Sequence, residues 1–239
     1  MIIVKVKKQK KSRNSLYKMS ITQKLLKIKS TLPSTATLVA VSKTKPISDL
    51  LEAYDAGQRI FGENKIQEMA EKWEAMPKDI EWHMIGHVQT NKVKFMAPFV
   101  SLIHGVDSLK LLQEINKQAK KNNRTIDCLL QMYIAEEETK FGLDEKELDE
   151  ILQFIQNDKN EMKNIRVVGL MGMATFTDNQ TQIEKEFTRL KSIFDTTNQL
   201  LTSNFQLLTL SMGMSGDYQL AIGCGSTMVR IGSSIFGGR

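Results

Sequence analysis

The chain has 239 residues, of which 41% are hydrophobic and 25% are charged, and this composition excludes a largely disordered protein. The formal net charge of +6 comes from residues 1–18, which hold seven Lys or Arg and no acid, so the rest has 26 basic against 27 acidic residues. The body of the protein therefore lacks the basic surplus of a nucleic-acid or membrane-surface protein, and no apolar run is long enough for a membrane span.

Residues 1–18 form a basic extension ahead of a single domain at 19–239, and three interpretations of it stay open. It is a solvated, disordered extension, an arm for nucleic acid or anionic lipid, or a targeting segment. Its apolar start, IIV, is too short for the core of a signal peptide. We favour the disordered extension, because Met19 is followed by a clear helix start.

The predicted elements alternate between helix and strand. The first helix begins at Ser20, where S-I-T-Q pairs a serine cap with a glutamine three residues on. Eight strands follow this helix, and each of them except the last is followed by a helical segment. The strands, each nearly continuous in apolar residues, are expected at 37–43, 59–64, 81–86, 102–106, 125–134, 165–175, 206–213 and 227–237.

Continuous rather than alternating apolarity predicts strands that are buried on both faces, as in a parallel sheet covered by helices. Strict alternation of strand and helix indicates the α/β class. Eight units favour closure into a (β/α)8 TIM barrel, with an open doubly wound sheet as the alternative.

Cysteine and histidine provide no clear metal site. Cys128 and Cys224 have no CxxC spacing, so neither a metal site nor a disulfide framework is indicated, and a reducing cytoplasm is expected. His83 and His87 are four residues apart, but the intervening MIG has the character of a strand, which would separate them.

Active sites of (β/α)8 barrels lie at the carboxyl ends of the strands, and Lys43 follows the first strand in LVAVSK. Apolar surroundings disfavour the ammonium form and free a nucleophilic lone pair, which a Schiff base with an aldehyde or ketone requires. The alternative is a solvated lysine or an ion-pair partner. Lys45, next to Pro46, is expected to face solvent.

The last two strands end in LSMGMSGD and VRIGSS, which supply Ser211 beside Gly213, and Gly232 beside Ser233. Glycine lets the backbone approach a ligand, and successive N–H groups with hydroxyls can hold an anion. The glycines could equally serve only tight corners of the barrel. A phosphate site combined with Lys43 predicts a phosphorylated carbonyl ligand, bound by a sugar-phosphate aldolase-like enzyme or by a pyridoxal phosphate (PLP) protein.

Six motifs together resemble the YggS/PROSC family of pyridoxal-phosphate-binding, or PLP homeostasis, proteins. The resemblance runs from about Ser20 to Gly237 and implies a barrel like the N-terminal domain of alanine racemase, the type III PLP fold. The motifs are LVAVSKTKP, IFGENKIQE, WHMIGHVQTNK, GLMGMATF, LSMGMSGDYQLAI and GSTMVRIGSSIFG.

The resemblance implies a PLP site built from residues near the start and near the end of the sequence. Lys43 matches the lysine that forms the Schiff base in this family. The phosphate-binding positions are matched by Ser211, Gly232 and Ser233.

Two further residues take roles from the resemblance. Arg230 matches an arginine that faces the pyridine nitrogen, and Asn64 matches an asparagine that lines the cofactor pocket. A guanidinium cannot accept the ring proton, so it disfavours a pyridinium and weakens the ring as an electron sink. His87 stands where some relatives have proline and receives no role.

Racemases of this fold recruit a tyrosine as second base from a C-terminal β-domain and a partner subunit, and this chain ends at Arg239, just after the last strand. We therefore expect a monomeric, cytoplasmic PLP-holding protein with no assigned catalytic residue and no robust activity of its own. It would act in PLP (vitamin B6) homeostasis and indirectly in amino-acid and keto-acid balance, with apo PLP-dependent enzymes as recipients. A small amino-acid racemase or another type III PLP enzyme is the alternative.

Overall fold

The computed structural model describes residues 19–137, 141–157, 161–202 and 205–238, so the basic extension predicted at 1–18 lies outside the described residues. Eight strands form a closed barrel in which each pairs in parallel with the next and the last pairs with the first. This closure confirms the (β/α)8 barrel. The strands are β1 (Thr37–Val41), β2 (Ile60–Glu63), β3 (Glu81–Met84), β4 (Leu102–Val106), β5 (Ile126–Gln131), β6 (Ile165–Met171), β7 (Thr209–Met214) and β8 (Met228–Ile231).

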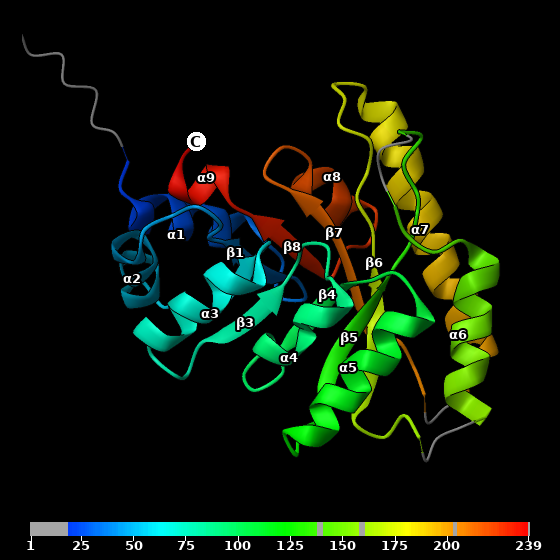
Figure 1. Ribbon diagram of the computed structural model, residues 1–239. Coiled ribbons are helices and arrows are strands. Elements are labelled where there is room, and N and C mark those ends of the chain that lie inside the picture. The colour runs from blue at the N-terminus through cyan, green and yellow to red at the C-terminus, as the bar shows by residue number, and fades with distance from the viewer. Residues whose placement is uncertain (1–18, 138–140, 158–160, 203–204, 239) are drawn as a thin grey trace, which may run out of the picture.

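Helices surround the barrel, with α1, α2 and α3 on one side and α6 and α7 on the opposite side (Figure 1). Within the described ranges, no helix combines the length and the apolar character that crossing a bilayer requires. The helices are α1 (Ile21–Thr31), α2 (Ile47–Asp55), α3 (Ile66–Ala75), the 3-10 helix η1 (Thr90–Lys92), α4 (Val93–Met96), α5 (Leu109–Lys121), α6 (Glu145–Asn157), α7 (Gln180–Leu200), α8 (Tyr218–Gly223) and α9 (Ser233–Phe236).

Helix α1 begins with the predicted capping box. The Gln23 backbone N–H donates to the Ser20 hydroxyl at 3.1 Å, and the Ser20 N–H donates to Gln23 Oε1 at 3.0 Å. These reciprocal bonds satisfy two donors that a helix start leaves without partners.

The continuous apolarity of the strands is explained by two cores. Outward-facing side chains pack against the helices in a large cluster that includes the fully buried Phe61, Trp82 and Phe187. Inward-facing side chains form a smaller apolar cluster inside the barrel, made by Val39, Leu102, Leu129, Met171 and Met228. Each strand therefore buries both of its faces.

Several predicted strand boundaries are wrong, and the fifth and sixth strands, expected to end at 134 and 175, end at Gln131 and Met171. The last strand, expected at 227–237, ends at Ile231, because Gly232 (φ −120°, ψ −72°) leaves the extended conformation and α9 follows. The seventh, expected to begin at 206, begins at Thr209. The backbone of Leu207 is bound by Asn198 of α7, through Leu207 N–H to Asn198 Oδ1 (2.8 Å) and Asn198 Nδ2 to the Leu207 carbonyl (2.9 Å).

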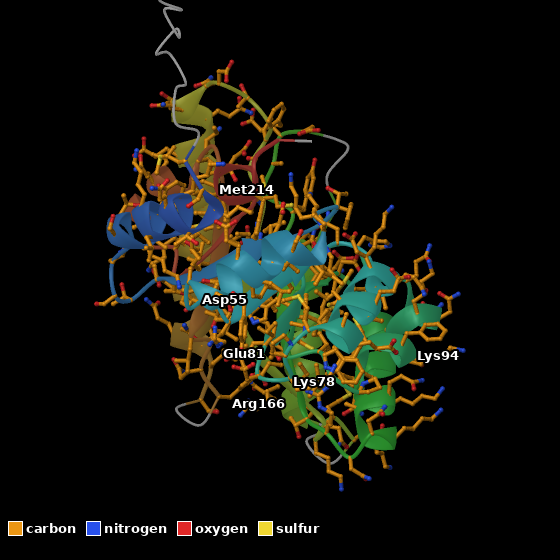
Figure 2. All side chains as sticks on the ribbon, turned by 90° about the vertical axis from the view of Figure 1, so that its left-hand side faces the viewer. Asp55, Lys78, Glu81, Lys94, Arg166 and Met214 are labelled. Carbon is orange, nitrogen blue, oxygen red and sulfur yellow. The ribbon has the colours of Figure 1, made fainter. Side chains whose placement is uncertain are left out.

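The parallel strands give the barrel two distinct ends. Met214 ends β7, whereas Glu81 begins β3 and Arg166 lies near the start of β6. Figure 2 shows Met214 toward one end of the molecule and Glu81 and Arg166 toward the other. The carboxyl ends of all eight strands therefore lie at the Met214 end, where the loops that precede the helices meet.

Gly169→Ala is expected to destabilise the barrel, because the added Cβ would lie 1.8 Å from the Thr209 carbonyl oxygen and force β6 away from β7. We expect a loss of about 3 kcal/mol in the free energy of unfolding, measured by urea denaturation. Gly223→Ala is the matched control, since its Cβ meets no described atom within 4 Å. A Gly169 variant as stable as this control would contradict the close approach of the two strands.

Candidate functional site

Lys43 lies on the inner side of the barrel mouth, directly after β1. The strand ladder continues one residue beyond β1, since the Ser42 N–H donates to the Gly62 carbonyl at 3.0 Å. Side chains alternate along a strand, and the Ser42 hydroxyl donates outward to Glu63 on the other face at 2.6 Å. Lys43 therefore shares the inner face with Val39, and its side chain is half-buried.

Lys45 differs from its prediction. Its side chain is partly buried rather than solvent-facing, and Nζ donates to the Gly238 carbonyl at 2.9 Å. This bond holds the Lys45 amine against Gly238, near the end of the described chain, whereas the predicted Schiff-base role belongs to Lys43.

The segment after β8 lies against the segment that carries Lys43. A Cβ added to Gly232 would lie 3.0 Å from the Val41 carbonyl oxygen and 3.2 Å from Val41 Cβ, so only glycine fits without displacement. The Gly232 N–H donates to the Ser215 hydroxyl at 3.1 Å, and Ser233 is exposed next to it. A hydroxyl bonded to a backbone donor, with an exposed serine on the next residue, therefore lies beside the strand end that precedes Lys43, and hydroxyls and backbone N–H groups are suited to an anion.

Ser215 is a residue to which the sequence analysis gives no role. It follows β7, whereas Ser211, to which the phosphate role was assigned, lies inside β7 and is fully buried. Both serines belong to LSMGMSGD. Serines four residues apart share a face of an extended strand, so only the end of β7 at Met214 separates the serine within the barrel from the serine at its mouth. The phosphate role of Ser211 stays a prediction.

The approach of β7 to α8 depends on Gly213. Its φ of +96° is left-handed, a conformation that side chains rarely adopt, and an added Cβ would lie 2.6 Å from Ala221 Cβ. This turn brings the chain back to Ser215, and the Asp217 carboxylate accepts from the Met214 N–H and fixes the loop.

Arg230 lies inside the barrel and is only 4% exposed. Its guanidinium donates to the Ser211 hydroxyl at 2.6 Å and to the Gly172 carbonyl at 3.1 Å. Burial lowers the pKa of Arg230 to about 10, and the nearby Asp217 carboxylate acts in the opposite direction. The group is therefore a buried cation at neutral pH.

A hydrogen-bonded chain runs inward from Arg230 through Ser211 and His104 to His83. Ser211 Oγ lies 3.1 Å from His104 Nδ1, and His104 Nε2 lies 3.1 Å from His83 Nδ1. Arginine can only donate, so the Ser211 hydroxyl accepts from Arg230. The directions of the bonds from Ser211 to His104 and from His104 to His83 depend on which ring nitrogens carry the protons. Both rings are neutral, because burial lowers the pKa of His83 to about 3 and that of His104 well below its ordinary value.

Asn64 follows β2 and is half-buried at the barrel mouth. Its backbone touches the loop after β3, since a Cβ on Gly86 would lie 2.4 Å from the Asn64 carbonyl oxygen. The role of Asn64 in lining a cofactor pocket stays a prediction.

His87 lies apart from these groups. Its Nδ1 is 3.3 Å from Asp107, and its ring contacts the edge of Phe141. In the described ranges, no group of three or more histidine, cysteine, aspartate or glutamate side chains is placed to hold a metal ion.

A hollow of about 1080 Å³ opens at the other end of the barrel, lined by residues at the starts of strands, including Thr37, Glu81 and Arg166. None of the predicted site residues lines it. The predicted site residues described above lie at the carboxyl ends of the strands or in the hydrogen-bonded series that begins at Arg230. The carboxyl end of the barrel is therefore the candidate site.

Known proteins are similar to this chain in sequence and in fold. The model of the alanine racemase N-terminal domain family matches residues 18–239. The pyridoxal phosphate homeostasis protein of Haemophilus influenzae is 41% identical over 209 residues, which cover 86% of each chain. The chain belongs to the pyridoxal phosphate homeostasis protein family. The Escherichia coli member of this family is 37% identical over 211 residues, or 87% of each chain.

Solved structures agree with this family membership. PipY of Synechococcus elongatus is 31% identical, and its structures without and with PLP bound superpose with TM-scores of 0.85 and 0.81 over 91% of this chain and 100% of PipY. Alanine racemase of Enterococcus faecalis superposes with a TM-score of 0.74 over 92% of this chain and 58% of the racemase. At 17% identity, the racemase shares the fold alone.

His83→Gln is expected to flatten the pH dependence of stability on the acid side. A histidine kept neutral by burial binds a proton only after unfolding, so its stabilising contribution is complete above the ordinary pKa of 6.5 and is lost as the pH falls toward about 3. The slope of the unfolding free energy should fall by about 1.4 kcal/mol per pH unit between about pH 6 and pH 4. Urea denaturation measures this slope, and an unchanged value would contradict a neutral His83.

Proposed function

We propose that this protein binds PLP at the carboxyl end of the barrel and acts in PLP homeostasis. The observation that carries the proposal is the meeting of the Lys43 segment with the Gly232–Ser215 hydrogen bond across adjacent strand ends, above the buried Arg230. Relatives named pyridoxal phosphate homeostasis protein and the PLP-bound structure of PipY support it. We propose further that residues 19–239 form this one cofactor-binding domain.

The residues of the site fit the chemical groups of PLP. The N–H of Gly232 and the hydroxyls of Ser215 and Ser233 would hold the phosphate, and Arg230 would face the pyridine nitrogen. PLP would supply an aldehyde at this site, and the Lys43 amine would condense with it, forming a C=N bond and releasing one water molecule.

Arg230 would limit the chemistry available at this site. Two of its five N–H donors serve Ser211 and Gly172, which leaves others for a ligand, and it remains protonated at neutral pH. A guanidinium donates to a pyridine nitrogen but has no proton acceptor, so the ring stays unprotonated and withdraws electrons weakly. The site is therefore better suited to holding the cofactor than to stabilising carbanions.

The tyrosines support a holding role. Each of the three described phenol groups has a hydrogen-bond partner other than Lys43, with Tyr54 donating to Asp79, Tyr133 to the Glu137 carbonyl, and Tyr218 bonded to Thr31. A racemase needs a second base on the opposite side of the substrate from the lysine. A screen of amino acids for α-deuterium exchange tests this distinction, and exchange at an appreciable rate would favour the racemase alternative.

We also propose that the protein acts as a monomer in the cytoplasm and passes PLP to the apo forms of PLP-dependent enzymes. Both cysteines are free thiols, as is usual in a reducing compartment. Mixing the PLP-loaded protein with an apo transaminase and following the recovery of transaminase activity tests the transfer, and recovery no faster than with free PLP would contradict it.

Lys43→Ala is expected to abolish covalent capture of PLP. Borohydride reduction of the wild-type mixture followed by peptide mapping should place the pyridoxyl group on Lys43. Lys45→Ala should retain the adduct, because the Lys45 amine is bonded to Gly238. A wild-type protein that gives no borohydride-stable adduct would contradict the proposed function.

Ser215→Ala is expected to weaken PLP binding by about tenfold to a hundredfold, the usual effect of removing a hydrogen bond to a charged group. Affinity for pyridoxal, which has no phosphate, should stay within about twofold of wild type. Ser48→Ala, at an exposed position in α2, is the control. Equal losses for PLP and pyridoxal would show that Ser215 does not hold the phosphate.

A further inference from the structure

Three charged side chains form a network on the outer side of β1 and β2, which the PLP site does not use. Lys72 Nζ donates to Glu63 Oε1 at 2.7 Å and to Glu68 Oε1 at 2.8 Å. The side chains of Lys72 and Glu63 are 7% and 0% exposed, and that of Glu68 is 24% exposed. The third donor of the Lys72 ammonium goes to the Ser42 carbonyl at 2.8 Å, so all three are used.

This network holds the backbone on both sides of Lys43. On one side, Ser42 accepts from Lys72 through its carbonyl and donates from its hydroxyl to Glu63 Oε1 at 2.6 Å. On the other side, the Thr44 N–H donates to Glu68 Oε1 at 2.6 Å. The residue that carries the reactive amine thus lies between two anchored neighbours.

Thr44 shows that these anchors act on the conformation of the chain. Its φ of +62° is left-handed, which is unfavourable for a β-branched residue and persists only where surrounding contacts impose it. Two described contacts hold this conformation: the Lys45 N–H donates to the Ser42 carbonyl at 3.0 Å across the turn, and the Thr44 N–H donates to Glu68. This conformation turns the backbone sharply immediately after Lys43.

Stability alone does not account for buried charge at this position. Burial raises the pKa of Glu63, while hydrogen bonds from Lys72 and Ser42 oppose that shift, and Glu63 Oε2 is buried without a partner in the described part of the chain. Apolar side chains of similar volume are usually at least as stabilising as a buried ion pair. They would offer no donor to the Ser42 carbonyl and no acceptor to the Thr44 N–H.

We propose that Glu63, Lys72 and Glu68 are positioning residues for Lys43. By fixing the backbone at Ser42 and Thr44, they hold the Lys43 amine in the direction that covalent capture of the aldehyde requires, before the ligand arrives. Orientation established in advance accelerates a bond-forming step because less freedom is lost in that step. This inference rests on the proposed function of Lys43, and none of the three residues needs to touch the ligand.

The test compares two ligands that share every contact except the covalent bond. PLP presents an aldehyde to Lys43, whereas pyridoxine 5′-phosphate presents an alcohol and cannot form a C=N bond. Glu68→Ala removes the acceptor of the Thr44 N–H at a partly exposed position, so the fold should survive. We expect capture of PLP to slow by about tenfold to a hundredfold, with the affinity for pyridoxine 5′-phosphate within about twofold of wild type.

Matched variants separate position from charge. Glu68→Gln keeps an oxygen acceptor for Thr44 and should capture PLP at a rate close to wild type. Lys45→Met removes a cation from the same loop without touching the network and should also match wild type. Lys72→Met should slow capture as Glu68→Ala does, and its thermal midpoint shows whether the unpaired Glu63 has unfolded the protein.

Amide hydrogen exchange in the ligand-free protein gives an independent readout. Exchange at Thr44 should rise by about tenfold or more in Glu68→Ala and remain near wild type in Glu68→Gln. Unchanged exchange would overturn the inference, and so would wild-type capture rates in Glu68→Ala or equal losses for both ligands. If Thr44 exchange rises in Glu68→Ala but the wild-type protein captures no PLP, the proposed function is rejected, and the anchoring of the Lys43 backbone would serve another ligand.

Discussion

The pairing of β1 with β8 is the contact on which the site depends. Parallel register from Thr37 opposite Met228 to Ala40 opposite Ile231 closes the barrel and joins the first and last strands of the chain. Two segments nearly 190 residues apart, those of Lys43 and Gly232, thereby become neighbours. The contact is so close that a Cβ on Gly232 would lie 3.0 Å from the Val41 carbonyl oxygen and would require a small displacement.

Buried polar groups lie on both sides of the closed sheet, and each set contains a cation that can only donate. Inside the barrel, Arg230 donates to Ser211, which is hydrogen-bonded in turn to His104. Outside it, Lys72 directs its three donors to Ser42 and two carboxylates. Burial in a medium of low polarity makes such groups costly when unpaired and directional when paired. The two sets hold opposite parts of one site, a buried cation below it and the Lys43 backbone beside it.

Much of this architecture could be predicted from the sequence. The order of eight strands followed from apolar runs, since burial of both faces leaves a simple compositional pattern, and Lys43 followed from its place at the end of the first run. The end of β8 at Ile231 could not, because SSIF is apolar enough to continue a strand and only the backbone of Gly232 turns it into α9. Ser215 was missed for a related reason, since two serines four residues apart look alike until the end of β7 is known.

The sequence alone determined the fold class, the family and the presence of a lysine at a strand end, because periodicity, motif order and residue chemistry are properties of the chain. Only the tertiary structure decided which groups meet. Local sequence gives no sign that Lys72, in α3, reaches the carbonyl before Lys43, or that His83 and His104 continue the chain below Arg230. These contacts join residues from different strands and helices, and their distances are set by barrel closure rather than by neighbours along the chain.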